Sequence, residues 1–136
     1  MVSSEVGFVE YQEGLKSFIN KLCYNRLVSY EGVLKATKAV FGYQKLIPIY
    51  VDTEILLFST QSIRNLDVLF INYHQIHKIR KLKNEIEILF YDQSTLRLQI
   101  GRAFINTQIK RCGAINNYLT KKSFESVYNY GLSIEI

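Results

Sequence analysis

Three stretches of the chain place their apolar residues at the spacing of amphipathic helices. In residues 15–26 the apolar side chains recur every three or four positions, with polar residues mostly between them. Residues 31–41 repeat this pattern, and Gly42 follows as a typical C-terminal stop. Residues 102–119 form the third helical stretch, in which Gly113 predicts a break or a close contact.

From Pro48 onward the period changes to that of β-strands, because β-branched and aromatic runs alternate with short polar breaks. Ile86, Ile88 and Phe90 alternate with other residues, which predicts one buried and one solvated face in antiparallel hairpins. A tight turn is expected at residues 83–84. The predicted strands of this meander are residues 49–51, 55–59, 68–72, 75–82, 85–91 and 95–99.

The last segment, residues 128–136, also alternates between apolar and polar positions and predicts a terminal strand. Such a strand needs a partner, either residues 6–11 of the same chain or another subunit. The pattern as a whole therefore predicts the α+β class, with two N-terminal helical segments, an antiparallel β-meander, and a C-terminal helix plus a terminal strand.

Length and composition favour a single domain over residues 1–136, since the chain is 136 residues long and 48% hydrophobic. Its longest apolar stretch, residues 46–51, is far shorter than the about 20 residues that cross a membrane. The first basic residue is Lys16, so no positive signal-peptide region opens the chain, and we expect a cytoplasmic protein without a membrane partner. Cys23 and Cys112 are too few for a disulfide scaffold and are interpreted as buried, reduced thiols.

The net charge of +5 is unevenly distributed, because residues 93–122 contain several basic residues and no acidic one. A second basic cluster spans residues 78–83. Such blocks attract polyanions, of which nucleic acid is the commonest in cells, although a lysine run also suits a solvated strand edge. The candidate DNA-binding residues are Lys78, Arg80, Lys81, Lys83, Arg97, Arg102, Lys110, Arg111, Lys121 and Lys122.

Motifs for catalysis, nucleotide binding or metal binding are absent from the sequence, so no catalytic residue, cofactor or metal is expected. His74 and His77 are the only histidines, and on a strand their spacing of three would point them to opposite faces. They are interpreted as packing or hydrogen-bonding residues. An enzyme hypothesis would have to use these two histidines and Ser29 alone.

Several short patches of the sequence follow one another in a recognisable order. The first is Ser29-Tyr30-Glu31-Gly32 with Cys23 six residues before it, and Gly42 and the patches that follow lie in register over about residues 17–119. The later patches are Pro48-Ile49-Tyr50-Val51-Asp52, Leu57-Phe58-Ser59-Thr60, Asp67 with Phe70-Ile71 and His74, Phe90-Tyr91-Asp92, and Phe104 with Gln108-Ile109-Lys110-Arg111. Together these patches resemble the ComK family of competence transcription factors. The sequence departs from the family at Val33, where the family has arginine, at Ser59, where it has proline, and at Gln93, where it has a turn glycine.

The resemblance implies a bacterial transcription activator that binds A·T-rich double-stranded DNA as a homo-oligomer, chiefly through the minor groove. Minor-groove readers combine Arg or Lys with Asn or Gln, which fits the composition of the basic segments. A regulatory protein is a further expected partner. The alternative is a ComK-like paralogue that acts as a protein-interaction or oligomerisation module with weak or no DNA binding, because position 33 lacks the arginine and residues 128–136 form an unpaired apolar segment.

Overall fold

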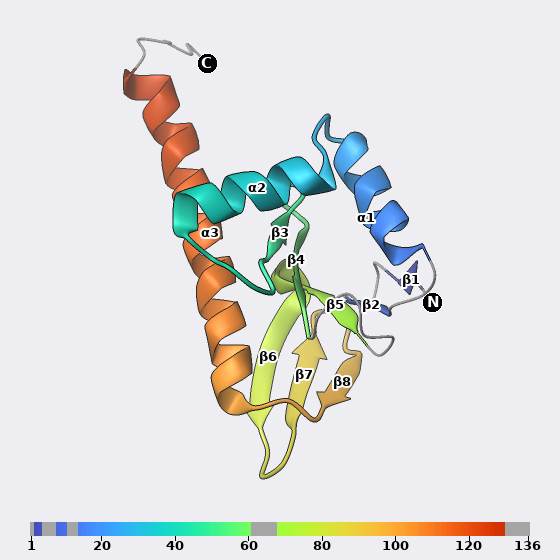
Figure 1. The fold of residues 1–136 in the computed structure, drawn as a ribbon. Helices are drawn as coiled ribbons and strands as arrows, with labels where there is room; N and C mark the ends of the chain where they lie inside the picture. The colour runs from blue at the N-terminus through green and yellow to red at the C-terminus, as the bar shows by residue number, and fades with distance from the viewer. Residues whose placement is uncertain (1, 4–7, 11–13, 61–67, 130–136) are drawn as a thin grey trace.

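The computed structural model describes residues 2–3, 8–10, 14–60 and 68–129 (Figure 1). Helices lie near both ends and strands between them, which confirms the α+β class. The elements are β1 (Val2–Ser3), β2 (Phe8–Glu10), α1 (Leu15–Tyr24), α2 (Tyr30–Phe41), β3 (Ile49–Tyr50), β4 (Leu56–Ser59), β5 (Leu69–Asn72), the 3₁₀ turn η1 (Tyr73–Gln75), β6 (Ile76–Lys81), β7 (Ile86–Phe90), β8 (Thr95–Leu98) and α3 (Arg102–Asn129).

The second helix begins one residue before its predicted range, at Tyr30, and ends where the sequence predicts. The Ser29 side chain accepts a hydrogen bond from the backbone N–H of Gly32 at 3.0 Å, which satisfies one of the free donors at the start of α2. Gly42 ends α2 with a φ of 76°, a left-handed conformation that glycine adopts without steric cost. The predicted stop at Gly42 is therefore confirmed.

The strands are antiparallel as expected, but they divide between two sheets. Sheet A has the order β1-β2-β5-β4-β3, and sheet B has the order β6-β7-β8. Two meanders thus replace the single predicted one, and the N-terminal strands β1 and β2 extend sheet A beyond β5. The sequence suggested residues 6–11 as one possible partner of the C-terminal segment. The strand described within that range, β2, pairs with β1 and β5.

Asn72 lies where the chain leaves sheet A. Its buried side chain accepts hydrogen bonds from the N–H groups of Leu56 (3.1 Å) and His74 (3.2 Å) and donates to the carbonyl of Glu54 (3.0 Å). The bond to His74 begins the 3₁₀ turn η1, which turns the chain out of sheet A before β6 starts. The bond to His74 is local, and such side chain–backbone bonds offer the backbone an alternative to the sheet ladder.

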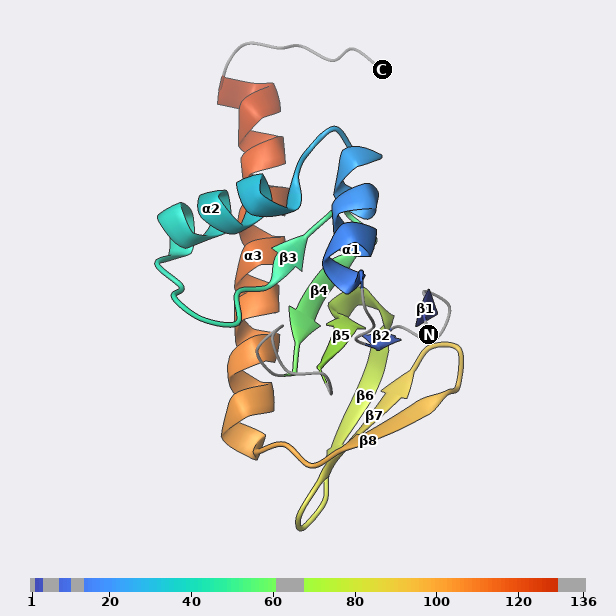
Figure 2. The same ribbon diagram turned by 45° about the vertical axis from the view of Figure 1, so that its right-hand side comes forward.

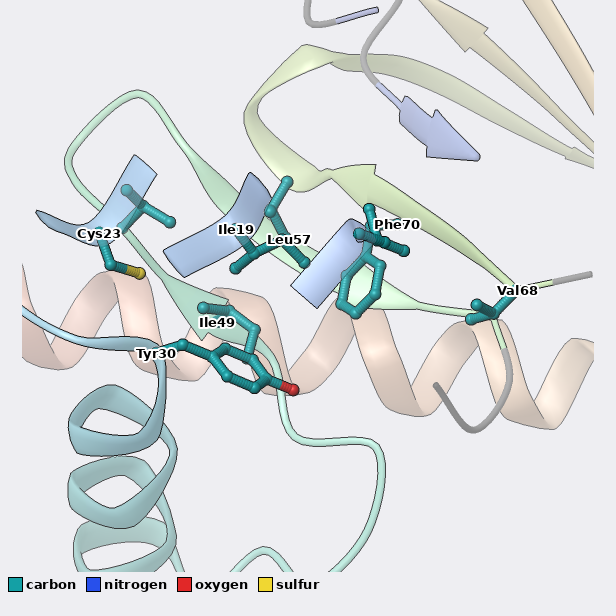
Figure 3. Packing of buried hydrophobic residues seen from close by; sticks show 9 residues of the cluster. Ile19, Cys23, Tyr30, Ile49, Leu57, Val68 and Phe70 are labelled. Atoms are coloured by element: carbon teal, nitrogen blue, oxygen red, sulfur yellow. The ribbon is translucent and has the colours of Figure 1, made fainter. Parts of the chain in front are cut away.

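The hydrophobic core lies on both faces of sheet A. On one face, α1 packs against residues of β3, β4 and β5 (Figure 3). On the other face, β4 and β5 pack against β7 and α3, so that β4 is buried throughout. The first cluster is Leu15, Ile19, Cys23, Tyr30, Ile49, Val51, Leu57, Val68 and Phe70, and the second is Leu56, Phe58, Ile71, Ile86, Ile88, Phe90, Ile105, Cys112 and Ile115.

The last helix runs from the end of sheet B past sheet A and α2 (Figure 2). It passes Gly113 without a break, and the Tyr73 hydroxyl lies 3.6 Å from where a Cβ would be, which is an ordinary van der Waals distance, so neither the predicted break nor a close contact occurs there. The helix continues to Asn129, so the prediction of a strand at 128–136 is wrong for its first two residues, and the others lie outside the described residues. Among the described helices, none combines the length and the apolar character of a membrane span.

Candidate nucleic-acid interface

The turn between β6 and β7 presents exposed basic residues at one end of the molecule (Figure 1). Leu82 donates its backbone N–H to the carbonyl of Glu85 at 2.9 Å, which leaves Lys83 and Asn84 as a two-residue loop. The predicted tight turn at 83–84 is therefore confirmed. Lys81, Lys83 and Asn84 are all exposed.

Arg102, the first residue of α3, is fixed against this turn. Its guanidinium Nη2 donates to the backbone carbonyls of Lys81 (3.4 Å) and Leu82 (3.3 Å). A groove of about 510 Å³ lies here, and its polar lining includes Lys83, Asn84, Gln99 and Arg102 together with Glu85, the carboxylate that pairs with Arg97. Because neutral carbonyl groups hold the guanidinium, Arg102 keeps its full positive charge beside Lys81 and Lys83.

The exposed side of α3 continues the positive charge away from the turn. At about 100° per residue, Arg102, Asn106, Lys110, Asn117 and Lys121 fall within an arc of about 100° of the helix surface. All five are exposed, and the sequence holds no acidic residue between positions 93 and 122. With a rise of about 1.5 Å per residue, this arc extends for about 28 Å along the helix. We call Lys81, Lys83, Arg102, Lys110 and Lys121 together the basic stripe.

The arginines of sheet B do not share this environment, because two glutamates neutralise them. Arg97 lies 3.1 Å from both Glu85 and Glu87, and Arg80 lies 3.2 Å from Glu87. The register places Arg80, Glu87 and Arg97 side by side on one face of the sheet. Lys78 is exposed on the same strand as Arg80 but makes no ion pair among the described residues.

Arg111 has a structural role, because its guanidinium contacts the loop that follows α2. It donates to the backbone carbonyl of Lys45 at 2.8 Å, and its guanidinium carbon lies 4.5 Å from the centre of the Tyr43 ring. On the same helix, the buried Gln108 donates to the carbonyls of Leu46 and Ser59. These two residues fasten α3 to the loop after α2 and to the end of β4. The side chain of Lys122 lies outside the described residues.

Comparison with known protein families gives one result. The family model described as ComK protein matches residues 1–123 of the 136-residue chain. The chain belongs to the ComK family. No curated protein and no solved structure was found to match it. ComK proteins are transcription factors associated with competence and not enzymes, so membership indicates a role in the regulation of transcription.

Two of the departures from the ComK pattern have a clear structural setting. Val33 is half-buried on α2 and packs against the cluster that contains Leu15 and Ile19, so this position does not belong to the basic stripe. Gln93 has a φ of 74°, in the left-handed region that favours glycine. This left-handed backbone conformation explains why the family has a turn glycine at this position.

The histidines and cysteines of this ComK protein have surroundings that do not favour metal binding or nucleophilic attack. No group of three metal-ligating side chains occurs among the described residues. The ring of His77 stacks on Tyr91 with centroids 4.9 Å apart, and burial lowers the pKa of His74. Burial likewise raises the pKa of the Cys23 and Cys112 thiols, so both are held in the neutral, weakly nucleophilic form.

Three residues of the candidate interface were not among the predicted site residues. Asn84 lies in the loop with Lys83, and Asn106 and Asn117 lie between the cations of α3. The helical period places Asn106 and Asn117 on the same face as Lys110, but a choice of site residues by charge alone leaves them out. Asparagine side chains both donate and accept hydrogen bonds, which lets them read base edges as well as phosphates.

Proposed function

We propose that this ComK protein is a transcription regulator that binds A·T-rich double-stranded DNA through the basic stripe. It would act as a single domain over residues 1–136 in the cytoplasm, as a homo-oligomer. The observation that carries the proposal is the segregation of charge. Lys81, Lys83, Arg102 and Lys110 face solvent without a carboxylate partner among the described side chains, whereas Arg80 and Arg97 are neutralised.

The loop at Lys83 and Asn84 is the part of the stripe that suits a DNA groove. It projects beyond the start of α3 in both views of the fold (Figures 1 and 2). A lysine and an asparagine at the end of a narrow two-stranded ribbon fit a narrow A·T groove, where the negative potential is enhanced and base edges mostly accept hydrogen bonds. The cations of α3 would then contact the phosphate backbone beside that groove.

Anisotropy titrations of labelled A·T-rich and G·C-rich duplexes at several salt concentrations test this proposal. Each cation that neutralises a phosphate contributes about −0.9 to the slope of log K against log salt, so the five cations of the stripe predict a slope of about −4.5. We expect tighter binding to the A·T-rich duplex. Absence of binding at low salt would refute DNA binding, and equal binding to both duplexes would refute the A·T preference.

A second candidate function is that of a protein-interaction module with weak DNA binding. It is favoured by the turn after α1, where Leu27 is 95% exposed and Tyr24 and Val28 are exposed beside it. Leu27 also has a φ of 63°, which is strained for a leucine. Replacement of Leu27 by asparagine should relieve this strain and remove the apolar contact. If Leu27→Asn binds DNA as the unmodified protein does but no longer supports transcription, this candidate gains support.

A further inference from the structure

Sheet B has two edge strands, and the edge formed by β6 carries several features that hinder pairing with another strand. Lys78 and Lys81 are exposed along it, and the register shifts between Ile76 and Lys78 as in a β-bulge. The carbonyl of Lys81 is occupied by Arg102. Lysine side chains, bulges and covered backbone groups are the usual means by which proteins protect a sheet edge.

The opposite edge, formed by β8, has no lysine, bulge or covered carbonyl among the described residues, and its one charged side chain, Arg97, is ion-paired. Among the described strands, β8 pairs only with β7, with a regular register and no bulge. Its sequence, from Thr95 to Leu98, contains neither lysine nor proline. One edge of the same sheet is therefore protected and the other is open.

The hydrogen-bond pattern shows which backbone groups this open edge presents. Phe90 donates its N–H to the carbonyl of Ser94 at 2.9 Å, so these two residues form a hydrogen-bonded pair at the turn. Because such pairs alternate along an antiparallel ladder, Leu96 and Leu98 bond to β7, and the N–H and C=O groups of Thr95 and Arg97 point to the open edge. These groups form a template for one more strand.

The side chains at this edge carry no net charge. Arg97 is held by Glu85 and Glu87, and Glu87 is shared with Arg80, so two positive and two negative charges cancel. The guanidinium of Arg97 is drawn toward β7, away from the open edge. A second strand with the same sequence can therefore approach with little of the repulsion that opposed like charges produce.

We propose that β8 pairs with β8 of a second copy of this chain, antiparallel across a two-fold axis near Arg97. Around this axis Leu96 faces Leu98 of the second copy, so apolar residues meet, and Arg97 faces Arg97 of the second copy, with each guanidinium held by its own glutamates. Leu96 and Leu98 are half-buried against the core on the inner face, and the second copy would cover them further. Two copies of sheet B then form one continuous sheet, an isologous interface typical of dimers.

This inference deepens the homo-oligomeric part of the proposed function by naming its surface. It leaves the basic stripe free, because β8 lies on the side of sheet B opposite to β6. DNA and the second copy would therefore bind to different surfaces of the same protein, and each interaction can be measured without the other.

The test is the molar mass of the full chain in the absence of DNA, measured by light scattering over a range of concentrations. The unmodified protein should approach twice the 15.9 kDa of one chain as its concentration rises. Thr95→Lys places a lysine on the open edge of each copy and should weaken dimerisation by about tenfold or more. The matched control is Thr107→Lys, the same replacement at an exposed position of α3, which should leave the dimer unchanged.

Thr95→Pro is a second variant, because it removes the N–H that points to the open edge but keeps the ladder to β7. Proline is tolerated at the first residue of an edge strand, and a thermal unfolding curve verifies that the variant is folded. A monomer at every concentration for the unmodified protein would overturn the proposal, as would a dimer that Thr95→Lys leaves intact. DNA titration of Thr95→Lys on a short duplex distinguishes the two proposals, since binding should persist when the dimer is lost.

Discussion

Lys110 allows the role of the basic stripe to be tested at a single position. It is exposed on α3, eight residues after Arg102 and within the same arc of the helix. Replacement of Lys110 by alanine removes one charge and no buried contact, and alanine is the better helix former, so the fold should keep its stability within about 0.5 kcal/mol. Any change in DNA affinity then reports the contact itself.

The size of the effect follows from counterion release. With five phosphate contacts the slope of log K against log salt is about −4.5, and with four it is about −3.6. Between about 50 and 200 mM salt, the unmodified protein should lose about 500-fold in affinity, whereas Lys110→Ala should lose about 150-fold. The loss should be equal for A·T-rich and G·C-rich duplexes, because a phosphate contact carries no sequence information.

Anisotropy titrations of the two proteins in the same salt series measure these slopes. Lys35→Ala is the matched control, since Lys35 is an exposed lysine on α2 and lies outside the stripe. Both variants lower the net charge by one, so a nonspecific effect of charge would change both slopes equally. A slope for Lys110→Ala that equals that of Lys35→Ala would refute the assignment of Lys110 to the interface.

Three further outcomes concern the fold and are measured by urea unfolding. Ser29→Ala removes the N-cap bond to Gly32 and should lower the free energy of unfolding by about 1 kcal/mol. Gln93→Gly relieves a left-handed backbone and should raise it by up to about 1 kcal/mol, with an unchanged value contradicting strain at this turn. Burial lowers the pKa of His74, so the fold favours its neutral form, and stability should fall as the pH drops below about 6.5; this dependence should be weaker in His74→Leu.

The first two helices and the start of α3 were the part of the fold that local sequence could predict, whereas the continuation of α3 to Asn129 was missed. The start of α2 at Ser29 and its end at Gly42 depend on contacts within a few residues, which a pattern can show. The division of the strands into two sheets could not be predicted in this way. It depends on the Asn72 side chain, which reaches Leu56 sixteen residues away, and the sequence gives no sign of that distant partner.

The candidate site was predicted in its composition but not in its arrangement. The register of β6 and β7 follows from the turn at Lys83, and it places Arg80 opposite Glu87. This pairing could have been derived from the predicted turn, and it removes Arg80 from the set of unpaired cations. The position of Arg111 could not be derived in this way, because the carbonyl of Lys45 that it binds is 66 residues away in the sequence.

The distribution of acidic residues explains why the two surfaces of this protein differ. Glu85 and Glu87 precede and follow the first residue of β7, so their carboxylates reach the arginines on the two neighbouring strands and leave sheet B without net charge at its open edge. The stretch from 93 to 122 has no acidic residue, so no carboxylate on the neighbouring turns of α3 can neutralise Lys110 in the same way. Association of like-charged copies requires a neutral surface, and DNA binding requires a charged one. Glu87→Lys replaces a negative charge of this neutral network by a positive one. If both proposals hold, the variant should form a weaker dimer and bind DNA more tightly. If dimerisation and DNA binding instead both became weaker or both became stronger, the two surfaces would not be separate.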